Sequence, residues 1–426
     1  MRIAIFSFEF PPQTAFGGIG TYSVQLADTL SQAGHDVEVF AGGKGSDRVR
    51  RKSGALVHTV GCTDQLDFAL PAARAFLVRH DEEPFEVIET PEYQAPALAA
   101  LKLAPEVASV VRLHTPTFLI SRINTPRESW RLPIRQVLGQ AKAAFRTWRA
   151  GEAPRSIHLA HGDLRDSWEI DRLEAEQARR CDLICSPSRD LVGFPHTKWG
   201  LPEEKTKHLP NLFEAHPRLR ELPVPGRGKT LGYFGRLEER KGIETLLAAL
   251  PKIAAQHPDL TLVCVGQSCR LPRRGMEAAE VISSLCRQLG ISCSIPGRVA
   301  PDEVPSWLGR CRVVMLPSVW ENFPYACLEA MVAGCAVIGS SAGGMADMIE
   351  PEIHGLLAKP GDAEAFAAHA SRLLADEELA VGLGRAARAR VEEEYSPRAL
   401  LPRYESAYRQ AIAARLHKPT ELLSQS

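Results

Sequence analysis

The chain has 426 residues, too many for one ordinary hydrophobic core, so two or three domains are expected. Apolar residues make up 45% and charged residues 24%, which is typical of globular proteins, and 51 basic residues balance 51 acidic ones. This balance provides no overall positive field for nucleic acid, and no apolar run approaches the roughly 18 residues of a membrane-spanning helix.

The first residues, M-R-I-A-I-F-S-F-E-F-P-P, predict a β-strand. Their apolar stretch is too short for a signal peptide, and no small-residue cleavage site follows it. The ten cysteines are scattered without a C-x-x-C pair, so we expect core thiols rather than disulfides or zinc ligands. These features predict a cytoplasmic protein.

Short apolar runs alternate with helical patterns along the chain, which predicts βαβ units and parallel sheets with helices on both faces. The strands predicted in the first half are Arg2–Ser7, Asp36–Phe40, Ala55–Val60, Phe85–Ile88, Ala108–His114, Leu183–Ser186 and Thr206–Leu209. The proline- and glycine-rich stretch Leu209–Lys229 predicts a linker. A second series of strands is predicted at Thr230–Phe234, Leu260–Val265, Ile291–Ile295, Val313–Leu316 and Ala336–Gly339.

This order predicts an α/β protein with two doubly wound domains of similar size, followed by helices after Asp362. Ligands of open parallel sheets bind beyond the carboxyl ends of the strands. The predicted site is therefore the cleft between the two sheets, lined by residues that directly follow strands.

A glycine-rich loop follows the first strand and contains Gly17 and Gly18. Glycines before a helix let backbone N–H groups approach a ligand, and the helix N-terminus favours an anion. The spacing differs from the dinucleotide fingerprint, so an ordinary flexible loop stays an alternative. His114 ends a later strand, V-V-R-L-H, where it could contact a sugar or serve only the structure.

Two cations, Arg236 and Lys241, lie five positions apart in G-R-L-E-E-R-K-G, after the first strand of the second series. Cations beside a helix N-terminus are poorly placed unless an anion joins them. Arginine supplies a planar fork and lysine a point charge, which together suit a diphosphate. We therefore predict a diphosphate contact, with a solvated surface pair as the alternative.

Two carboxylates, Glu321 and Glu329, bracket the start of a predicted helix in S-V-W-E-N-F-P-Y-A-C-L-E-A-M-V-A. The backbone amides from Asn322 to Pro324 could hold an anion, and Glu321 could accept hydrogen bonds from sugar hydroxyls. Glu329 has apolar neighbours, so its charge needs a partner. Ribose hydroxyls are the usual partner of such a carboxylate in nucleotide sites, and a solvent-facing Glu329 is the alternative.

Together these stretches resemble the retaining family 4 glycosyltransferases of the GT-B fold. The matching segments, in order, are G-G-I-G-T-Y, R-L-H-T-P, S-P-S-R-D, L-P-N, G-R-L-E-E-R-K-G, L-V-C-V-G and W-E-N-F-P-Y-A-C-L-E-A-M-V-A-G. The last of them fits the E-x7-E motif of that family. The resemblance spans nearly the whole chain and implies two Rossmann-like domains facing across a cleft, with a C-terminal helix that crosses back to the first domain.

The resemblance also implies a division of the chain. Residues 1–215 would form the acceptor-side domain, with a basic helical insert at about 119–167. Residues 216–395 would form the nucleotide-sugar-binding domain, and residues 396–426 the crossover helix and tail.

Individual roles follow from the same resemblance. Arg236 and Lys241 would contact the donor diphosphate, and Glu329 would bind the ribose. Glu321 and His114 would contact the transferred sugar, and these two, with Arg236 and Lys241, are the catalytic candidates. The full donor-binding set is Gly17, Gly18, Gly235, Arg236, Lys241, Gly266, Arg298, Val299, Glu321, Asn322, Phe323, Pro324 and Glu329. The acceptor-side candidates are Tyr22, Glu92 and Tyr93.

The implied activity is transfer of a hexose-type sugar, with retention, to a hydroxyl of a glycan, a lipid-linked or a small-molecule acceptor. The donor would be linked to UDP, GDP, ADP or dTDP, and the resemblance implies neither a cofactor nor a metal ion. A sugar-nucleotide epimerase or phosphorylase on the same fold, and a binding subunit without turnover, stay open as alternatives.

The segment from Arg122 to Arg155 has eight basic residues and two acidic ones, with apolar residues at helical spacing between Trp130 and Trp148. A basic amphipathic helix can pack on its own domain, lie on the inner face of an anionic membrane, or cover an anionic acceptor. The sequence leaves these three interpretations open.

Overall fold

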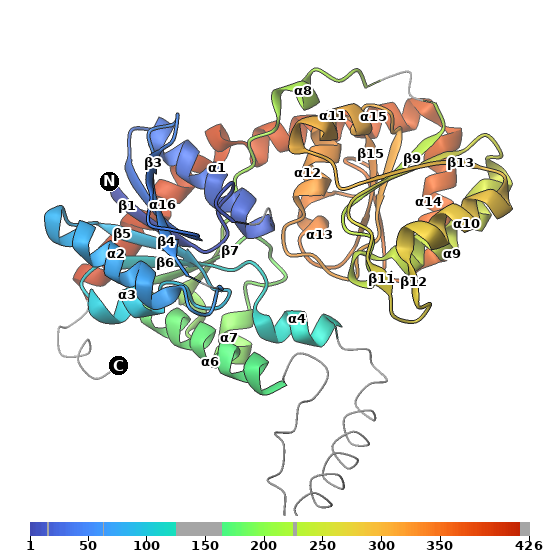
Figure 1. The fold of residues 1–426 in the computed structure, drawn as a ribbon. Helices are drawn as coiled ribbons and strands as arrows, with labels where there is room; N and C mark the ends of the chain where they lie inside the picture. Colours follow the sequence, from blue (N-terminus) through green and yellow to red (C-terminus); the bar gives the residue numbers. More distant parts are fainter. Residues whose placement is uncertain (15–16, 63, 125–163, 225–227, 418–426) are drawn as a thin grey trace, which may run out of the picture.

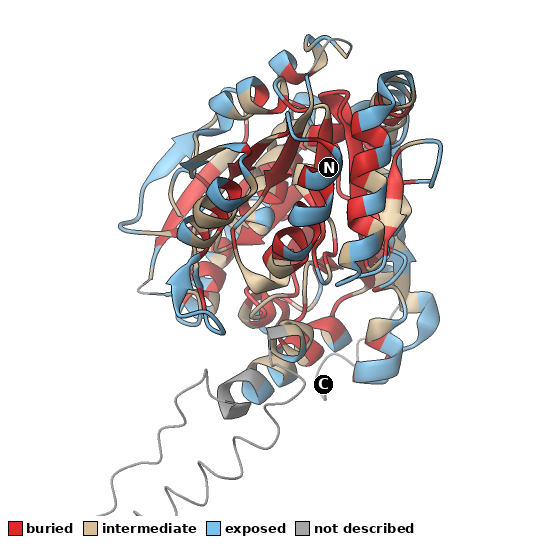
Figure 2. Cartoon of the chain, turned by 90° about the vertical axis from the view of Figure 1, so that its right-hand side faces the viewer, coloured by how far each residue is buried: buried red, intermediate tan, exposed pale blue. Residues whose placement is uncertain are grey.

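The computed structural model describes residues 1–14, 17–62, 64–124, 164–224 and 228–417. Two sheets, each flanked by helices, lie side by side (Figure 1). Buried residues concentrate in the strands and on the inward faces of the helices (Figure 2). The predicted basic helix between Trp130 and Trp148 lies outside the described residues. Within them, no helix is both long and apolar enough to cross a bilayer.

The first sheet has eight strands. In spatial order they are β3 (Arg48–Arg50), β4 (Leu56–Gly61), β2 (Asp36–Gly43), β1 (Arg2–Ser7), β5 (Val87–Pro91), β6 (Ala108–Arg112), β7 (Leu183–Ser186) and β8 (Thr206–His208). Every neighbouring pair is parallel except β3 and β4. Its helices are α1 (Gly18–Gln32), α2 (Ala69–Glu82), α3 (Leu98–Leu103), α4 (Thr117–Asn124), α6 (Leu164–Arg180) and α7 (Phe194–Trp199).

Strand β1 shows why these runs are apolar throughout. Ile3 and Ile5 point to the core beneath α1, while Ala4 and Phe6 point to the core beneath α2 and α3. Alternate side chains of a strand face opposite sides, so a strand covered on both faces needs no polar positions.

The second sheet has six parallel strands. In spatial order they are β13 (Ser292–Gly297), β10 (Thr261–Val265), β9 (Thr230–Phe234), β14 (Val313–Leu316), β15 (Ala336–Ser340) and β16 (Leu356–Ala358). One face packs on α9 (Ile243–Gln256), α10 (Ala278–Leu289) and α14 (Ala363–Ala375). The other packs on α11 (Val304–Leu308), α12 (Tyr325–Val332), α13 (Met345–Met348) and α15 (Glu377–Glu394).

Shorter elements connect these units. They are η1 (Glu203–Lys205), α8 (Pro217–Arg220), η2 (Glu239–Lys241), the hairpin β11 (Arg270–Leu271) with β12 (Met276–Glu277), and η3 (Pro301–Glu303). The chain passes between the two sheets twice, and the two crossings meet where the Phe213 N–H donates to the Tyr395 carbonyl at 2.8 Å.

After the second crossing, α16 (Pro397–Leu416) returns to the first sheet, as expected for the crossover helix. The Ser396 side chain caps it by accepting from the Ala399 N–H at 3.3 Å. Leu400, Tyr404 and Tyr408 of α16 are part of the same buried cluster as β1 and α1.

The strand order fixes where ligands are expected. In the first sheet the order reverses between β1 and β5, and in the second between β9 and β14. Open α/β sheets bind ligands at such switch points, outside the carboxyl ends of the strands.

The predicted strands coincide with β1, β7, β9 and β14, and the other eight differ from the structure only at their ends. Three features of the structure, β3, β16 and the β11–β12 hairpin, have no counterpart among the predicted strands. In β3 all three residues are exposed, so it lacks the apolar run that marked the other strands of its sheet.

Candidate active site

The carboxyl ends of β9 and β14 bring together Lys241 and Glu321, which are eighty residues apart in the sequence. Lys241 Nζ lies 2.6 Å from Glu321 Oε1, and Arg240 Nη1 lies 3.1 Å from the same oxygen. Burial raises the pKa of Glu321, but the charges of Lys241 and Arg240 outweigh it and hold that pKa below its ordinary value. Glu321 is therefore an ionised carboxylate with two cationic partners.

A second carboxylate, Glu238, extends this cluster. Its Oε1 lies 3.0 Å from Arg236 Nη2 and 3.2 Å from Arg240 Nη2. Arg236 has 54% of its side chain exposed, so one face of its guanidinium is available to a ligand. Glu238 and Arg240 were not among the predicted site residues, although both stand in the quoted G-R-L-E-E-R-K-G segment.

Three cations thus share two carboxylates at the switch point of the second sheet. Arg236, Arg240 and Lys241 carry one more positive charge than Glu238 and Glu321 neutralise. A diphosphate that entered here would offer its oxygens to cations already positioned by the protein.

Glycines bring the surrounding loops close to one another. A Cβ atom on Gly266 would collide with the Gly235 carbonyl, so the loops after β9 and β10 can meet because position 266 is glycine. Gly344 likewise lies against the Asn322 carbonyl, and its N–H donates to the Glu321 carbonyl at 2.8 Å. The turn after β14 is therefore held by the turn after β15.

Glu329 lies in α12, the helix that starts after this turn. It is partly buried, and among the described residues its carboxylate has no hydrogen bond or ion pair. Burial raises the pKa of Glu329 to about 7. A carboxylate held without a partner in this position suits hydroxyl groups brought by a ligand.

In the first sheet, Gly17 precedes α1 with an extended backbone, and Gly18 begins the helix. A Cβ atom on Gly17 would collide with the Glu9 carboxylate, which accepts from the Gly20 N–H at 3.4 Å. Burial raises the pKa of Glu9. A carboxylate thus occupies the helix N-terminus at Gly17 and Gly18, where an anionic part of the donor was expected, and no sequence pattern predicts Glu9 there.

His114 follows β6 and its ring contacts Tyr22 edge-on, with the ring centroids 5.1 Å apart. Burial and the charge of Arg112 lower the pKa of His114 to about 3. Its imidazole is therefore neutral near pH 7, and its Nε2 is buried without a hydrogen-bond partner among the described residues.

Two acceptor-side candidates need correction, because they lie beneath the surface. Tyr22 is only 2% exposed and donates to Glu89, and Glu92 is fully buried and accepts from the His114 N–H at 2.7 Å. Tyr22 packs against the His114 ring and Glu92 holds the His114 backbone, so both position His114. Neither side chain can reach an acceptor in this structure. Tyr93 is partly exposed.

The two domains touch directly at the site. The Asn322 side chain accepts from Ser188 Oγ at 2.5 Å and donates to the carbonyls of Leu113 at 3.0 Å and His114 at 2.5 Å. Asp347 accepts from the Arg189 N–H at 2.7 Å. We call these contacts the interdomain clasp.

The structure therefore brings Lys241 and Glu321 into direct contact, links Arg236 to them only through Glu238 and Arg240, and joins His114 to Asn322 across the domains. Phe323 and Pro324 connect Asn322 to α12, and Phe323 packs on the Tyr325 ring, with centroids 5.7 Å apart. Arg298 and Val299 follow β13, beside Gly266, whose N–H donates to the Gly297 carbonyl at 2.9 Å. No sequence pattern predicts the clasp, although its Ser188 and Arg189 stand in S-P-S-R-D, one of the segments that carry the family resemblance.

Two family descriptions match the chain. Residues 17–212 match "Glycosyl transferase 4-like domain" and residues 217–390 match "Glycosyl transferases group 1". The D-inositol 3-phosphate glycosyltransferase of Corynebacterium jeikeium is 30% identical over 411 residues, which cover 90% of this chain and 91% of that protein. The phosphatidyl-myo-inositol mannosyltransferase of Mycolicibacterium smegmatis is 27% identical over 395 residues, covering 90% and 87%.

Solved structures show the same architecture. Sucrose-phosphate synthase from Thermosynechococcus elongatus aligns with a TM-score of 0.71 at 22% identity, covering 97% of this chain and 99% of that one. HepE of Anabaena in complex with UDP aligns with a TM-score of 0.65 at 18% identity, covering 95% and 99%.

Proposed function

This chain belongs to the family 4 glycosyltransferases of the GT-B fold, and we propose that it transfers a hexose-type sugar from a nucleoside-diphosphate sugar to an acceptor hydroxyl. We propose further that the anomeric configuration is retained and that the protein's own cations stabilise the leaving diphosphate. The process served would be the synthesis of a glycan, a polysaccharide or a glycolipid.

One observation carries the proposal: Lys241 and Glu321 meet at the switch point of the second sheet, 2.6 Å apart, with Arg236 and Arg240 beside them. Negative charge develops on the diphosphate as the bond to the sugar breaks. Prepositioned cations lower the energy of that state without having to reorganise.

The relatives support a nucleotide sugar as the donor class. HepE has been solved with UDP and with UDP-glucose, and starch synthase IV of Arabidopsis thaliana with ADP and acarbose. Glu329 would accept from the ribose hydroxyls, because its carboxylate has no partner among the described residues.

The state of His114 supports retention. An inverting transfer needs a general base beside the acceptor hydroxyl, and a base works best when its pKa is near the working pH. A histidine with a pKa of about 3 is a weak base, and Glu92 beside it is fully buried. We assign His114 a contact with the transferred sugar.

The acceptor is proposed only as a class. The names of two relatives specify D-inositol 3-phosphate and phosphatidyl-myo-inositol, and both molecules present hydroxyl groups. We propose that the acceptor hydroxyl enters on the side of the first domain, beside Tyr93 and His114, which are both partly exposed.

The test begins with a screen of UDP-, GDP-, ADP- and dTDP-linked sugars, with release of free nucleoside diphosphate as the measurement. Lys241→Ala is expected to lower turnover about 10²–10³-fold, because it removes one charge that stabilises the leaving group. Lys229→Ala is the matched control, since Lys229 forms an exposed ion pair with Asp259 away from the site. Equal turnover of the two variants would contradict the assignment of Lys241.

Retention is tested on the product. An α-linked donor is expected to give an α-glycoside, recognised by its anomeric coupling constant in NMR. A β-glycoside from the same donor would refute the retaining assignment.

A further inference from the structure

A second concave site lies at the outer edge of the first sheet. It is a cavity of about 360 Å³ between β3, β4 and α2, and β4 is separated from the switch-point strand β1 by β2. Its polar lining includes Arg48, His58, Thr59 and Arg74, and Val60 and Val78 supply part of an apolar wall. A volume of this size suits a small molecule.

The charges around this cavity are unbalanced. Arg48 and Arg74 are both exposed, and neither has a carboxylate partner among the described residues. Asp47 is the one carboxylate in the lining. Other arginines of this domain do have carboxylate partners, such as Arg51 with Asp28 and Arg79 with Glu38.

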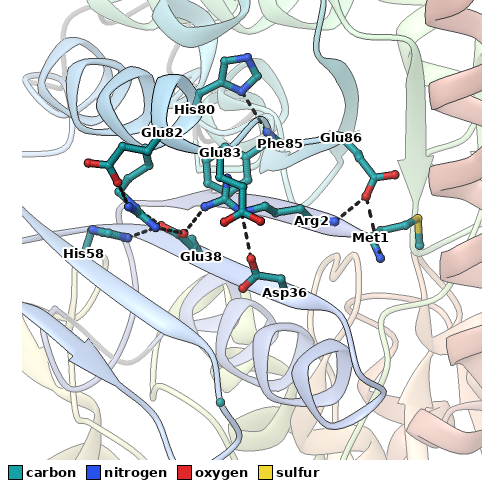
Figure 3. A network of polar contacts seen from close by, with 12 residues as sticks. Met1, Arg2, Asp36, Glu38, His58, His80, Glu82, Glu83, Phe85 and Glu86 are labelled. Carbon is teal, nitrogen blue, oxygen red and sulfur yellow. Dashed lines mark hydrogen bonds and ion pairs between the residues drawn. The ribbon is translucent and has the colours of Figure 1, made fainter.

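His58 is fixed in the wall of the cavity by a buried network (Figure 3). Its Nε2 lies 2.6 Å from Glu38 Oε2, and its ring stacks on Phe40 with centroids 4.9 Å apart. Glu38 also accepts from Arg2 at 2.5 Å and from Arg79 at 2.8 and 2.9 Å.

This network determines which nitrogen of His58 carries a proton. Burial raises the pKa of Glu38, but the hydrogen bonds from His58 and Arg79 outweigh burial and hold that pKa well below its ordinary range. Glu38 is therefore ionised and can only accept, so Nε2 of His58 is the donor. Nδ1 then has no hydrogen bond among the described residues and is the nitrogen left for a ligand.

We propose that the cavity between β3, β4 and α2 binds a small molecule that bears a phosphate group, held by Arg48, Arg74 and His58. Arginine forks match phosphate oxygens. With its proton on Nε2, His58 can accept at Nδ1 from a phosphate O–H, and it donates there to a phosphate oxygen only when the ring takes up a second proton. The hydroxyls of Ser46 and Thr59 offer additional hydrogen bonds, and the apolar wall would contact the carbon skeleton. This site is separate from the proposed donor site and does not depend on the proposed activity.

The experiment is calorimetry on the full chain with two probes, inorganic phosphate and glucose 6-phosphate, and glucose as the uncharged match for the second. Arg48→Ala/Arg74→Ala is the test variant. Arg50→Ala/Lys52→Ala is the matched control, because it removes two exposed cations in and directly after β3 that do not line the cavity. Both double variants carry the same net charge, and unfolding temperatures show whether each is folded.

We expect at least one phosphate probe to bind the wild-type chain, glucose not to bind, and the test variant to lose at least about tenfold in affinity. The control should stay within about twofold of wild type. Equal affinities for the two probes would show that the phosphate group alone is recognised. A higher affinity for glucose 6-phosphate would show that the carbon skeleton also contacts the apolar wall. The proposal is overturned if neither probe binds up to about 10 mM, if the test variant binds like wild type, or if the control loses as much.

Discussion

Three carboxylates at the two switch points differ in what surrounds them. Glu321 has two cations as partners, Glu9 has a backbone N–H, and Glu329 has no partner among the described residues. The pKa of Glu321 accordingly lies below its ordinary value, while those of Glu9 and Glu329 are raised. Burial disfavours the charge on both Glu9 and Glu329, but only on Glu329 does no partner among the described residues offset that cost before a ligand arrives.

That cost predicts how stability depends on pH. The folded-state pKa of Glu329 is about 7, against an ordinary value of 4.5, so between these pH values the folded chain holds a proton that the unfolded chain has lost. The contribution of Glu329 to stability therefore falls as pH rises from 4.5 to 7, by up to about 3 kcal/mol. Glu329→Gln should raise the unfolding temperature at pH 8 and leave it nearly unchanged at pH 4.5.

The control for that measurement is Glu393→Gln, at an exposed position of α15. It should shift the unfolding temperature little at either pH. If Glu329→Gln and wild type showed parallel pH profiles, the uncompensated charge on Glu329 would be disproved.

Binding separates the two motif glutamates. Glu329→Gln should weaken free nucleoside diphosphate about ten- to a hundredfold, because charge-assisted hydrogen bonds to the ribose are lost. Glu321→Gln releases Lys241 and Arg240 from their carboxylate, so it should keep or raise nucleoside diphosphate affinity while lowering turnover. Calorimetry of both variants is the measurement, and equal losses of diphosphate affinity would contradict this division of roles.

At the scale of elements, the site depends on loops that touch through their backbones. The turn after β15 packs on the turn after β14 because Gly344 leaves room for the Asn322 carbonyl. The position of Glu321 relative to Lys241 is thus set by the turn after β15 as well as by β14, the strand that Glu321 follows.

Gly344→Ala should therefore act on both stability and binding. The added methyl group collides with the Asn322 carbonyl, and we expect a loss of about 1–3 kcal/mol in unfolding free energy together with weaker donor binding. The control is Gly382→Ala in α15, which should raise the free energy of unfolding by up to about 1 kcal/mol. A Cβ atom there meets nothing within 4 Å, and alanine favours a helix over glycine. Denaturant unfolding measures both changes, and a Gly344→Ala variant as stable as wild type would show that the turns can separate.

Most strands could be predicted from sequence because burial on two faces requires continuous apolar runs, as in β9 and β14. The chemistry of Arg236, Lys241, Glu321 and Glu329 was suggested by their places after strands. Their pairing was not predictable, since the contact between Lys241 and Glu321 arises from the order of strands in the sheet. Glu9 could not be predicted for the same reason, because its contact with Gly17 and Gly20 depends on how the loop after β1 folds and leaves no local sequence pattern.

At the scale of the whole molecule, the clasp holds the two domains together in this structure. The Asn322 side chain makes three hydrogen bonds to the first domain and is only 4% exposed. If substrates of the proposed reaction enter and leave between these domains, we expect the clasp to open during each cycle.

Asn322→Ala should shift the population of domain arrangements toward open ones. Three buried hydrogen bonds are lost, and the radius of gyration measured by small-angle X-ray scattering is expected to increase. Ser188→Ala removes one of the three bonds and should produce a smaller increase. A radius of gyration unchanged in Asn322→Ala would mean that other contacts keep the domains closed.

The return of α16 to the first sheet has a consequence for synthesis on the ribosome. The core beneath α1 includes Leu400, Tyr404 and Tyr408, which are translated after all of the second sheet. Residues 1–215 thus emerge first but cannot complete that core until residues 397–416 have left the exit tunnel. The second domain is expected to finish folding earlier, which reverses the usual order of N-terminal domain first and leaves one face of the first sheet exposed to chaperones meanwhile.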